Sequence, residues 1–375
     1  MFDSVGRYLE SASYLLPGNI FHLVLLVTAR CNHRCGYCYY WQGQGRKDAR
    51  PEMTLKEYEQ LAEQVGRVMC LSVSGGEPTL RTDLADIISV FHKKAKVRMV
   101  QLHSNGSFPE RLERTVRTLL ERHSDLAIDV CLSIDGLGAD HDDVQQSPGS
   151  FEQLLATVHR LEAPQAKTSG LGIELNTTYS ALTAPRVKDI AKFVTETLQK
   201  SFNMALVRGN PRDPSALGVD PNEFRKVARE IGCYEQGSSA DSYPFSSFVD
   251  AIRKLVPDLS VDAVLQGRQQ VPCRAGRQLL VVDEVGDVFP CEMLGQSFGN
   301  LRESEYNLNA LISGPKAEAI KAFIEAGRCH CSWECAIPVS LLFSPAGLVK
   351  VGKTWSELAI GRVMDKAAKL TGGGA

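Results

Sequence analysis

The sequence predicts an α/β fold, a partial barrel of six βα units followed by a small C-terminal domain of β-hairpin and helices. Six short apolar runs rich in β-branched residues alternate with amphipathic helical patterns, which is typical of parallel strands covered by helices. The region beyond residue 270 differs, with short strand-like runs, turns and many cysteines. Six units are too few to close an eight-stranded barrel, so we expect an open sheet.

The predicted elements follow one another along the first 208 residues. We expect strands at 21–28, 69–74, 97–104, 126–134, 171–179 and 204–208. We expect helices at 53–66, 82–94, 109–122, 150–161 and 185–200. In the first of these helices Thr54 is a good N-cap, and Tyr58, Leu61 and Val65 recur on one face. Residues that end parallel strands meet at one edge of the sheet, where such folds collect their chemistry.

Changes in composition divide the rest of the chain. Pro, Gly and Asp are frequent from 209 to 223, and helical patterns follow around 221–231 and 244–255. From 271 onward the chain has little apolar sequence, so we expect metal to help hold its shape. The predicted regions are an N-terminal arm (1–20), the barrel (21–215), a helical connector (216–270), a cysteine-rich auxiliary domain (271–345) and a C-terminal helix with a flexible tail (346–375).

The composition argues against several classes of protein. The formal net charge of -2 and the lack of a basic stripe argue against a nucleic-acid partner. The N-terminus lacks the regions of a secretory signal, and the run at 21–28 is too short to cross a bilayer. We therefore expect a cytoplasmic protein with no membrane span, whose eleven cysteines are thiols or metal ligands. The isolated Cys70, Cys131 and Cys233 are expected to be small core residues.

Three cysteines in the segment CNHRCGYC directly follow the first predicted strand. Cys31, Cys35 and Cys38 are spaced i, i+4 and i+7. No regular strand presents such a set together, but a loop wrapped around a cube of iron and sulfide can hold all three. One iron then has no protein ligand and is open to a substrate or cofactor. Zinc is the alternative, with His33 as a possible fourth ligand.

This spacing, with an aromatic residue before the last cysteine, resembles the signature of the radical SAM enzymes. The resemblance implies a partial (β/α)6 barrel and a 4Fe-4S cluster on Cys31, Cys35 and Cys38. It also implies that S-adenosylmethionine chelates the open iron, with Tyr37 beside the adenine.

The segment SVSGGEP, at 72–78, ends the second predicted strand. A Gly-Gly turn lets backbone carbonyls approach a ligand closely, and Glu77 offers negative charge to an ammonium group. The stretch resembles the GGE motif of the same family. The resemblance implies contacts to the methionyl amine from Ser74, Gly75, Gly76 and Glu77.

Other predicted strand ends carry polar residues that would face the same edge. Turn chemistry alone explains such residues without a ligand. In the family that the chain resembles, residues at these places contact the ribose or the substrate, and an arginine meets the methionyl carboxylate. The implied contacts are Ser104, Asn105, Ser133, Asp135, Asn176 and, for the carboxylate, Arg208.

The C-terminal cysteines have a spacing of their own. Twelve residues separate Cys273 from Gly286, and four separate Gly286 from Cys291. Together with FGNLRE at 298–303, this resembles the SPASM and twitch auxiliary domains. A structural zinc knuckle is the alternative. The resemblance implies one second 4Fe-4S cluster on Cys273, Cys291, Cys331 and Cys335, with Cys329 as a spare or substitute ligand.

Glu292 directly follows Cys291. In some SPASM enzymes an acidic residue at this place takes the substrate proton, so Glu292 is a candidate general base. An exposed acidic residue on a hairpin is the plain alternative.

The resemblance implies that an electron from a donor such as flavodoxin or ferredoxin cleaves S-adenosylmethionine to a 5′-deoxyadenosyl radical, which removes hydrogen from a substrate. About twenty residues precede the first strand, too few for a leader-binding domain. We therefore expect a small-molecule substrate, a sugar, nucleotide or lipid-linked metabolite; the apolar stretch 336–351 could line a lipophilic pocket or pack against the barrel. The alternatives are a maturase of a ribosomal peptide, an iron-sulfur electron carrier and a zinc-stabilised binding module.

Overall fold

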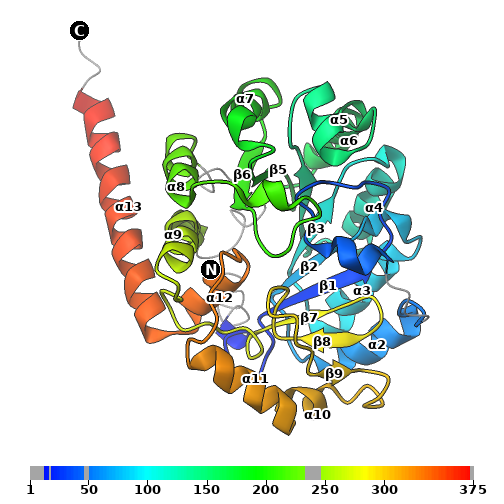
Figure 1. Cartoon of the computed structure of the whole chain (residues 1–375). Coiled ribbons are helices and arrows are strands. Elements are labelled where there is room, and N and C mark those ends of the chain that lie inside the picture. Colours follow the sequence, from blue (N-terminus) through cyan, green and yellow to red (C-terminus); the bar gives the residue numbers. More distant parts are fainter. Residues whose placement is uncertain (1–11, 17, 46–49, 233–245, 372–375) are drawn as a thin grey trace.

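The computed structural model describes residues 12–16, 18–45, 50–232 and 246–371 (Figure 1). Most of the predicted N-terminal arm, Cys233 and the last four residues of the predicted tail lie outside these ranges. Cys70 and Cys131 are buried in the core, as predicted.

Six parallel strands form the main sheet, and its open edge confirms the partial barrel. They are β1 (His22–Thr28), β2 (Cys70–Gly75), β3 (Met99–Ser104), β4 (Ala127–Ser133), β5 (Leu171–Tyr179) and β6 (Ser201–Leu206), hydrogen-bonded in that order. The sixth strand begins three residues earlier than predicted and ends before Val207. Its burial alternates, with Ser201 and Asn203 on the less buried face, so polar residues hid the start of the strand from a search for apolar runs.

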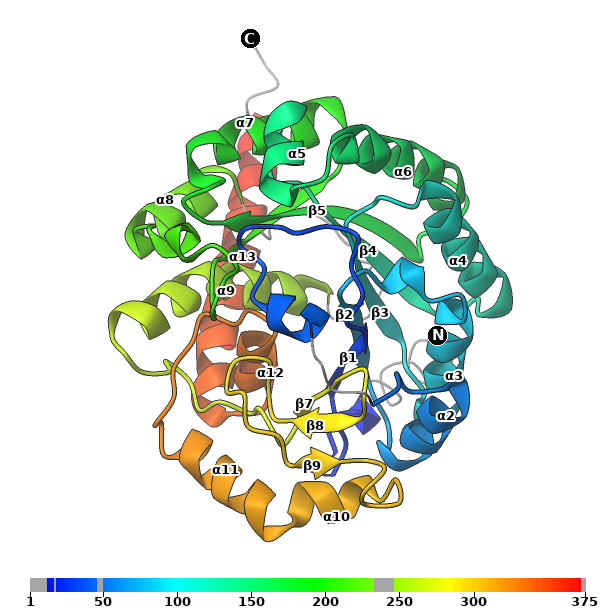
Figure 2. The same ribbon diagram turned by 45° about the vertical axis from the view of Figure 1, so that its right-hand side comes forward.

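Helices cover the outer face of this sheet (Figure 2). They are α2 (Leu55–Gln64), α3 (Leu84–Ala95), α4 (Pro109–Arg122), α6 (Ser150–Gln165) and α7 (Val187–Lys192), which continues into a π-helical turn, η4 (Phe193–Thr197). Thr54 caps α2 in a capping box with Glu57, as its position predicts. Among the helices of the barrel, α5 (Ala139–Gln145) was not predicted, because its sequence ADHDDVQ has no apolar stripe.

The C-terminal region extends the barrel sheet at its β1 edge. Strand β7 (Leu279–Val282) pairs in parallel with β1, β8 (Asp287–Phe289) pairs antiparallel with β7, and β9 (Gly299–Asn300) with β8. The predicted hairpin is therefore present, but it builds no separate core. Leu280, Val288 and Leu301 join the same apolar cluster as the barrel strands. Apolar burial against the barrel thus helps to hold a region that was expected to depend on metal.

Four further helices pack against one another beside the sheet. α8 (Pro221–Glu230) and α9 (Ser246–Leu265) form the predicted connector, and α12 (Ala336–Leu342) and α13 (Pro345–Thr371) pack against α9. Ile337, Leu341 and Val351 are buried with Ile252 and Leu259 of α9. The apolar stretch 336–351 therefore packs largely against these helices, and part of it joins the apolar cluster of the barrel, as one of its two predicted roles required.

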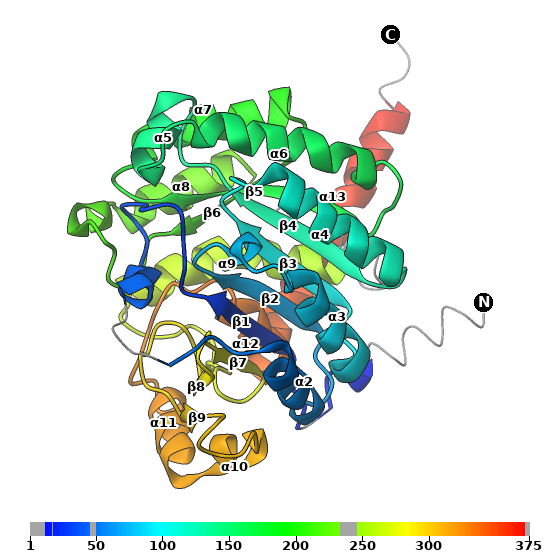
Figure 3. The ribbon, with the colours of Figure 1, turned by 90° about the vertical axis from the view of Figure 1, so that its right-hand side faces the viewer.

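Two further helices, α10 (Leu308–Ser313) and α11 (Pro315–Glu325), lie beside β9, at the opposite end of the molecule from α5, α6 and α7 (Figure 3). In the part of the chain that the structure describes, no helix is both long enough and apolar enough to cross a membrane.

Candidate active site

The first cysteine set lies in the loop that leaves β1, at the carboxyl edge of the sheet. The thiols of Cys31, Cys35 and Cys38 act on one another electrostatically. Burial raises the pKa of Cys31 to about 11, and the negative charge of Glu77 and Cys38 adds to this rise. Three thiols in such a place hold their protons until a cation binds, so metal binding here would release protons.

His33 is not available as a fourth ligand. Its side chain is buried, Nδ1 lies 2.7 Å from Gln145 Oε1, and Nε2 lies 2.6 Å from Ser107 Oγ. Both ring nitrogens are thus occupied by protein partners. Among the described residues, no three His, Cys, Asp or Glu side chains come together closely enough to hold one metal ion. The thiols of a 4Fe-4S cluster bind separate irons, so the donor set fits a three-ligand cluster better than zinc.

The unpredicted helix α5 holds the first cysteine loop in place. The backbone N–H of Arg34 donates to Gln145 O (3.1 Å), and that of Gly36 donates to Val144 O (3.2 Å). The Cys35 thiol donates to Gln145 Oε1 (3.1 Å). Gln145 is fully buried, and nothing in the sequence pointed to it, because its partners in the cysteine loop are more than one hundred positions away.

Tyr37, predicted to lie beside the adenine, is fixed by Asp135. The Tyr37 hydroxyl and Gln145 Nε2 each donate to Asp135 Oδ2, both at 2.6 Å. Burial raises the pKa of Asp135 to about 6, although these hydrogen bonds oppose the rise. Asp135, predicted as a contact of the cofactor or substrate, therefore already has protein partners and orients the tyrosine.

The Gly-Gly turn packs against the start of the cysteine loop. Gly75 has a φ of +121°, and a Cβ at Gly75 would lie 2.4 Å from Thr28 O. A Cβ at Gly76 would lie 2.0 Å from Arg30 O. The N–H of Gly76 donates to Thr28 O (2.7 Å). These glycines therefore allow the ends of β1 and β2 to approach closely, a reason that the sequence alone did not reveal.

Glu77 is buried among donors from its own chain. Its Oε1 accepts from the N–H and hydroxyl of Thr79 (3.0 and 2.6 Å) and from Ser104 Oγ (2.9 Å), and its Oε2 accepts from the Asn105 N–H (2.8 Å). Asn105 Nδ2 donates to Asn32 Oδ1 in the cysteine loop (2.9 Å). The predicted residues Ser104, Asn105 and Glu77 are thus brought together, and Glu77 ties the ends of β2 and β3. Ser74, half-buried at the end of β2, precedes them.

Ser133 and Asn176 are register partners in β4 and β5. Both are half-buried at the carboxyl ends of their strands, near the start of the Asp135 turn. The structure therefore brings the predicted strand-end residues to one edge of the sheet.

Arg208 lies with the C-terminal residues. Its Nη1 is 2.5 Å from Glu334 Oε2, its Nη2 is 4.0 Å from Glu292 Oε2, and its guanidinium lies 5.3 Å from the centroid of the Tyr39 ring. A different arginine, Arg212, lies near the first cysteine set, where its positive charge opposes the rise that burial causes in the pKa values of the Cys31 and Cys38 thiols.

Glu292, the candidate base, is enclosed and not exposed. Its side chain is 7% exposed, and Tyr39, the residue after Cys38, donates its hydroxyl to Glu292 Oε2. Burial raises the pKa of Glu292, while the positive charge of Arg208 opposes that rise. Tyr39, Arg208, Glu292 and Glu334 contact one another and form what we call the charged group; Tyr39 and Glu334 were not singled out from the sequence.

The C-terminal cysteines have different electrostatic neighbours. Cys331 and Cys273 both raise the pKa of Cys291, and Cys331 and Cys329 both raise that of Cys273. The main electrostatic neighbours of the Cys335 thiol are instead Glu334, Glu292, Arg208 and Cys70. Cys329 and Cys331 therefore lie near Cys273, and Cys335 lies beside the charged group.

Comparison with known proteins agrees with this geometry. Residues 25–169 match the family model described as the radical SAM superfamily. An AdoMet-dependent heme synthase of Methanosarcina barkeri is 25% identical over 75% of this chain and 79% of the relative. A mycofactocin maturase of Mycobacterium tuberculosis is 25% identical over 71% of this chain. The alignment spans only 62% of the maturase, less than two thirds of its length.

A solved structure shares the fold. The crystal structure of Streptococcus suis SuiB bound to S-adenosylmethionine matches with a TM-score of 0.55 and 18% identity, over 85% of this chain and 72% of that chain. At this identity the likeness shows the fold alone, and it agrees with the partial barrel described above.

Proposed function

The chain belongs to the radical SAM superfamily, and on that basis we propose that it removes a hydrogen atom from a small polar substrate held between its two cysteine sets. The observation that carries the proposal is the three-thiol loop at the carboxyl edge of the sheet, whose own His33 is hydrogen-bonded through both ring nitrogens. Such a loop leaves one iron of a cluster open to S-adenosylmethionine.

Cys31, Cys35 and Cys38 hold the 4Fe-4S cluster in this proposal. When bound, the cluster and S-adenosylmethionine supply reductive cleavage to methionine and the hydrogen-abstracting 5′-deoxyadenosyl radical. The chain itself orients Tyr37 through Asp135. Arg212, the cation that acts on the Cys31 and Cys38 thiols, takes the methionyl carboxylate in place of Arg208.

The C-terminal region holds the second 4Fe-4S cluster. Its ligands are the four cysteines that act on one another electrostatically, Cys273, Cys291, Cys329 and Cys331. Cys335 lies beside the charged group and is not a ligand of the second cluster in this proposal.

Glu292 takes the substrate proton. It lies one residue from Cys291 and accepts a hydrogen bond from Tyr39, one residue from Cys38, so it faces both cysteine sets. Burial raises its pKa toward the range in which a carboxylate is an effective general base near neutral pH.

The charged group favours a small substrate rich in hydrogen-bonding groups. The side chains of Arg208 and Glu292 are only 15% and 7% exposed. His103, at the end of β3, acts electrostatically on this group, and burial lowers its pKa to about 4, so it is neutral at pH 7. Charged and hydrogen-bonding side chains of this kind suit a sugar or nucleotide better than a lipid chain.

A peptide maturase is the second candidate function. The similarity to a mycofactocin maturase over 71% of this chain favours it. Both candidate functions use the same cofactors and differ only in the substrate.

The test is anaerobic reconstitution with iron and sulfide, followed by dithionite, which replaces the flavodoxin or ferredoxin donor, and S-adenosylmethionine. We expect release of 5′-deoxyadenosine, stimulated by the metabolite fraction of a cell extract separated by size. Stimulation by the peptide fraction alone would support the maturase.

The matched variant replaces Cys31, Cys35 and Cys38 with Ala. It should release no 5′-deoxyadenosine but should keep the iron of the second cluster. Absence of nucleoside release from wild-type protein with full iron content would refute the proposed function and favour an electron carrier.

A further inference from the structure

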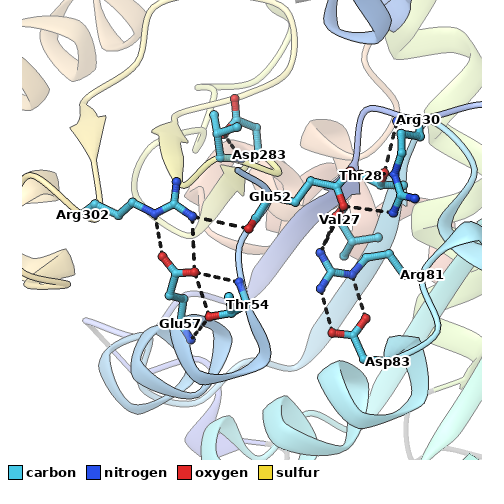
Figure 4. Close-up of polar contacts among 11 residues, drawn as sticks. Val27, Thr28, Arg30, Glu52, Thr54, Glu57, Arg81, Asp83, Asp283 and Arg302 are labelled. Carbon is cyan, nitrogen blue, oxygen red and sulfur yellow. Dashed lines mark hydrogen bonds and ion pairs between the residues drawn. The ribbon is translucent and has the colours of Figure 1, made fainter. Parts of the chain in front are cut away.

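Residues 50–57, which run into the first turn of α2, contact two separate parts of the molecule (Figure 4). One part is the start of the first cysteine loop, and the other is the hairpin that leads to Cys291. We call this segment the junction. From the sequence, only the helix cap Thr54 was predicted in this segment.

The first arm of the junction is Glu52. Its Oε1 accepts from the Thr28 hydroxyl (2.5 Å) and from Arg30 Nε (3.2 Å), and its Oε2 lies 3.1 Å from Arg30 Nη2. Arg81, which follows the Gly-Gly-Glu turn, lies 3.7 Å from the same carboxylate and donates to Val27 O (3.2 Å). Glu52 therefore holds the backbone that enters the first cysteine loop.

The second arm is Glu57, at the first turn of α2. Arg302 donates through Nε to Glu57 Oε1 (2.6 Å) and through Nη2 to Oε2 (3.3 Å), and the Tyr306 hydroxyl donates to Oε1 (2.6 Å). Burial alone would raise the pKa of Glu57, but the hydrogen bonds from Arg302, Thr54 and Tyr306 outweigh it and lower the pKa to about 2. The carboxylate is thus charged at any working pH.

Two more contacts join the junction to the hairpin turn. Arg50 donates to both oxygens of Asp287, each at 3.0 Å, and the Met53 N–H donates to Glu284 O (2.7 Å). Inside the turn, Asp283 Oδ1 accepts from the N–H groups of Val285 and Asp287. The turn is therefore stiff, and it is held from outside by the junction.

These contacts explain what the residues of the segment GNLR, at 299–302, do in the structure. Asn300 Nδ2 donates to Val285 O and Asp287 Oδ1, and Leu301 is buried in the core. These two residues bring Arg302 against α2. Since β7 pairs with β1 only from Leu279 to Val282, the sheet does not hold the turn beyond Val282, and the junction does.

We propose that Glu57 and Arg302 are positioning residues that fix the hairpin bearing Cys291 and Glu292 relative to the loop bearing Cys31. The inference rests on the proposed function for its purpose, because a displacement of about 1 Å in a reacting site can cost about a hundredfold in rate. The geometry itself does not depend on either cluster.

The test is hydrogen exchange, measured by mass spectrometry, on the full chain with its clusters. The variants are Glu57→Gln and Arg302→Met, with Arg302→Lys as the conservative form. We expect exchange across 283–289 and 299–306 to become about tenfold faster in the first two variants, the effect of losing a charge-assisted hydrogen bond. Arg302→Lys should restore part of the protection. The strand 99–104 should stay unchanged in every variant.

Glu63→Gln is the matched control. Glu63 lies on the same helix, and its partner is Lys94 on the surface, so this variant should exchange like the wild type. Pulsed EPR of the reduced protein should show a broader distance distribution between the two clusters in Arg302→Met than in Arg302→Lys.

Unchanged exchange in 283–289 in both Glu57→Gln and Arg302→Met would overturn the proposal, as would equal acceleration across the whole chain, since that reports general destabilisation. If the protein assembles only one cluster, the proposed two-cluster function is refuted. Faster exchange of the hairpin in the variants of that protein would still support the positioning role.

Discussion

Asp135 is a buried carboxylate that holds side chains of the first cysteine loop in place. It accepts hydrogen bonds from Tyr37 and Gln145, and through Gln145 it connects to the Cys35 thiol. The sequence placed Asp135 among the ligand contacts because it ends a strand. Its complete burial and its protein partners show that it also anchors the cysteine loop.

The pH dependence of stability should reveal this burial. Burial raises the pKa of Asp135 from 3.8 to about 6. The unfolded state therefore ionises first, and the native state loses stability as the pH rises from about 4 to about 6. Across this range Asp135→Asn should gain about 3 kcal/mol relative to the wild type. Urea unfolding of both proteins at pH 4 and pH 7 measures the change, and a difference that is independent of pH would contradict the assignment.

Gly76 is a residue whose role is packing as much as ligand approach. A Cβ there would lie 2.0 Å from the backbone oxygen of Arg30, which cannot move without shifting the cysteine loop. Gly76→Ala should therefore cost at least about 3 kcal/mol in the free energy of unfolding. Thermal unfolding measures this loss.

Gly352 is the matched control for that substitution. It lies in α13 with no atom within 4 Å of an added Cβ, so Gly352→Ala should stabilise the helix by about 1 kcal/mol. Equal effects of the two substitutions would remove the packing argument.

At the scale of elements, the segment 329–335 divides its three cysteines between two places. Cys329 and Cys331 act on Cys273, whereas Cys335 lies with Glu334 and Arg208. Spacing alone favoured Cys331 and Cys335, because it cannot tell which way each thiol points from an irregular loop.

Serine variants separate these two ligand sets. Cys329→Ser should lose most iron and sulfide of the second cluster, while Cys335→Ser should keep both. Iron and acid-labile sulfide assays on the two reconstituted proteins measure this, and the converse result would restore the set inferred from spacing.

The helix α5 is the clearest case of an element that the sequence concealed. Its seven residues are mostly polar, so no apolar period marks it. Its value lies in long-range contacts, because its last residues, Val144 and Gln145, bind the backbone of the cysteine loop. Gln145 is consequently a site residue that no local signal could have identified.

At the scale of the whole molecule, one sheet joins the barrel to the C-terminal region. The order β6-β5-β4-β3-β2-β1-β7-β8-β9 makes β1 a central strand. The loop after β1 carries the first cysteine set, and the hairpin next to β1 carries part of the second. This adjacency explains how Tyr39 can donate to Glu292 although 253 positions separate them.

The sequence by itself determined the six βα units, the strand ends and the three-cysteine loop, because apolar periodicity and short spacings are local properties of the chain. The GGE turn and the two hairpin cysteines could also be predicted from local sequence. Only the tertiary structure decided which residues share the charged group, which side chains lie beside Cys335, and what His33, Gln145 and Arg302 bind. Those outcomes depend on pairings between distant segments, and such pairings follow from how β7 docks on β1 and how α5 closes over the loop.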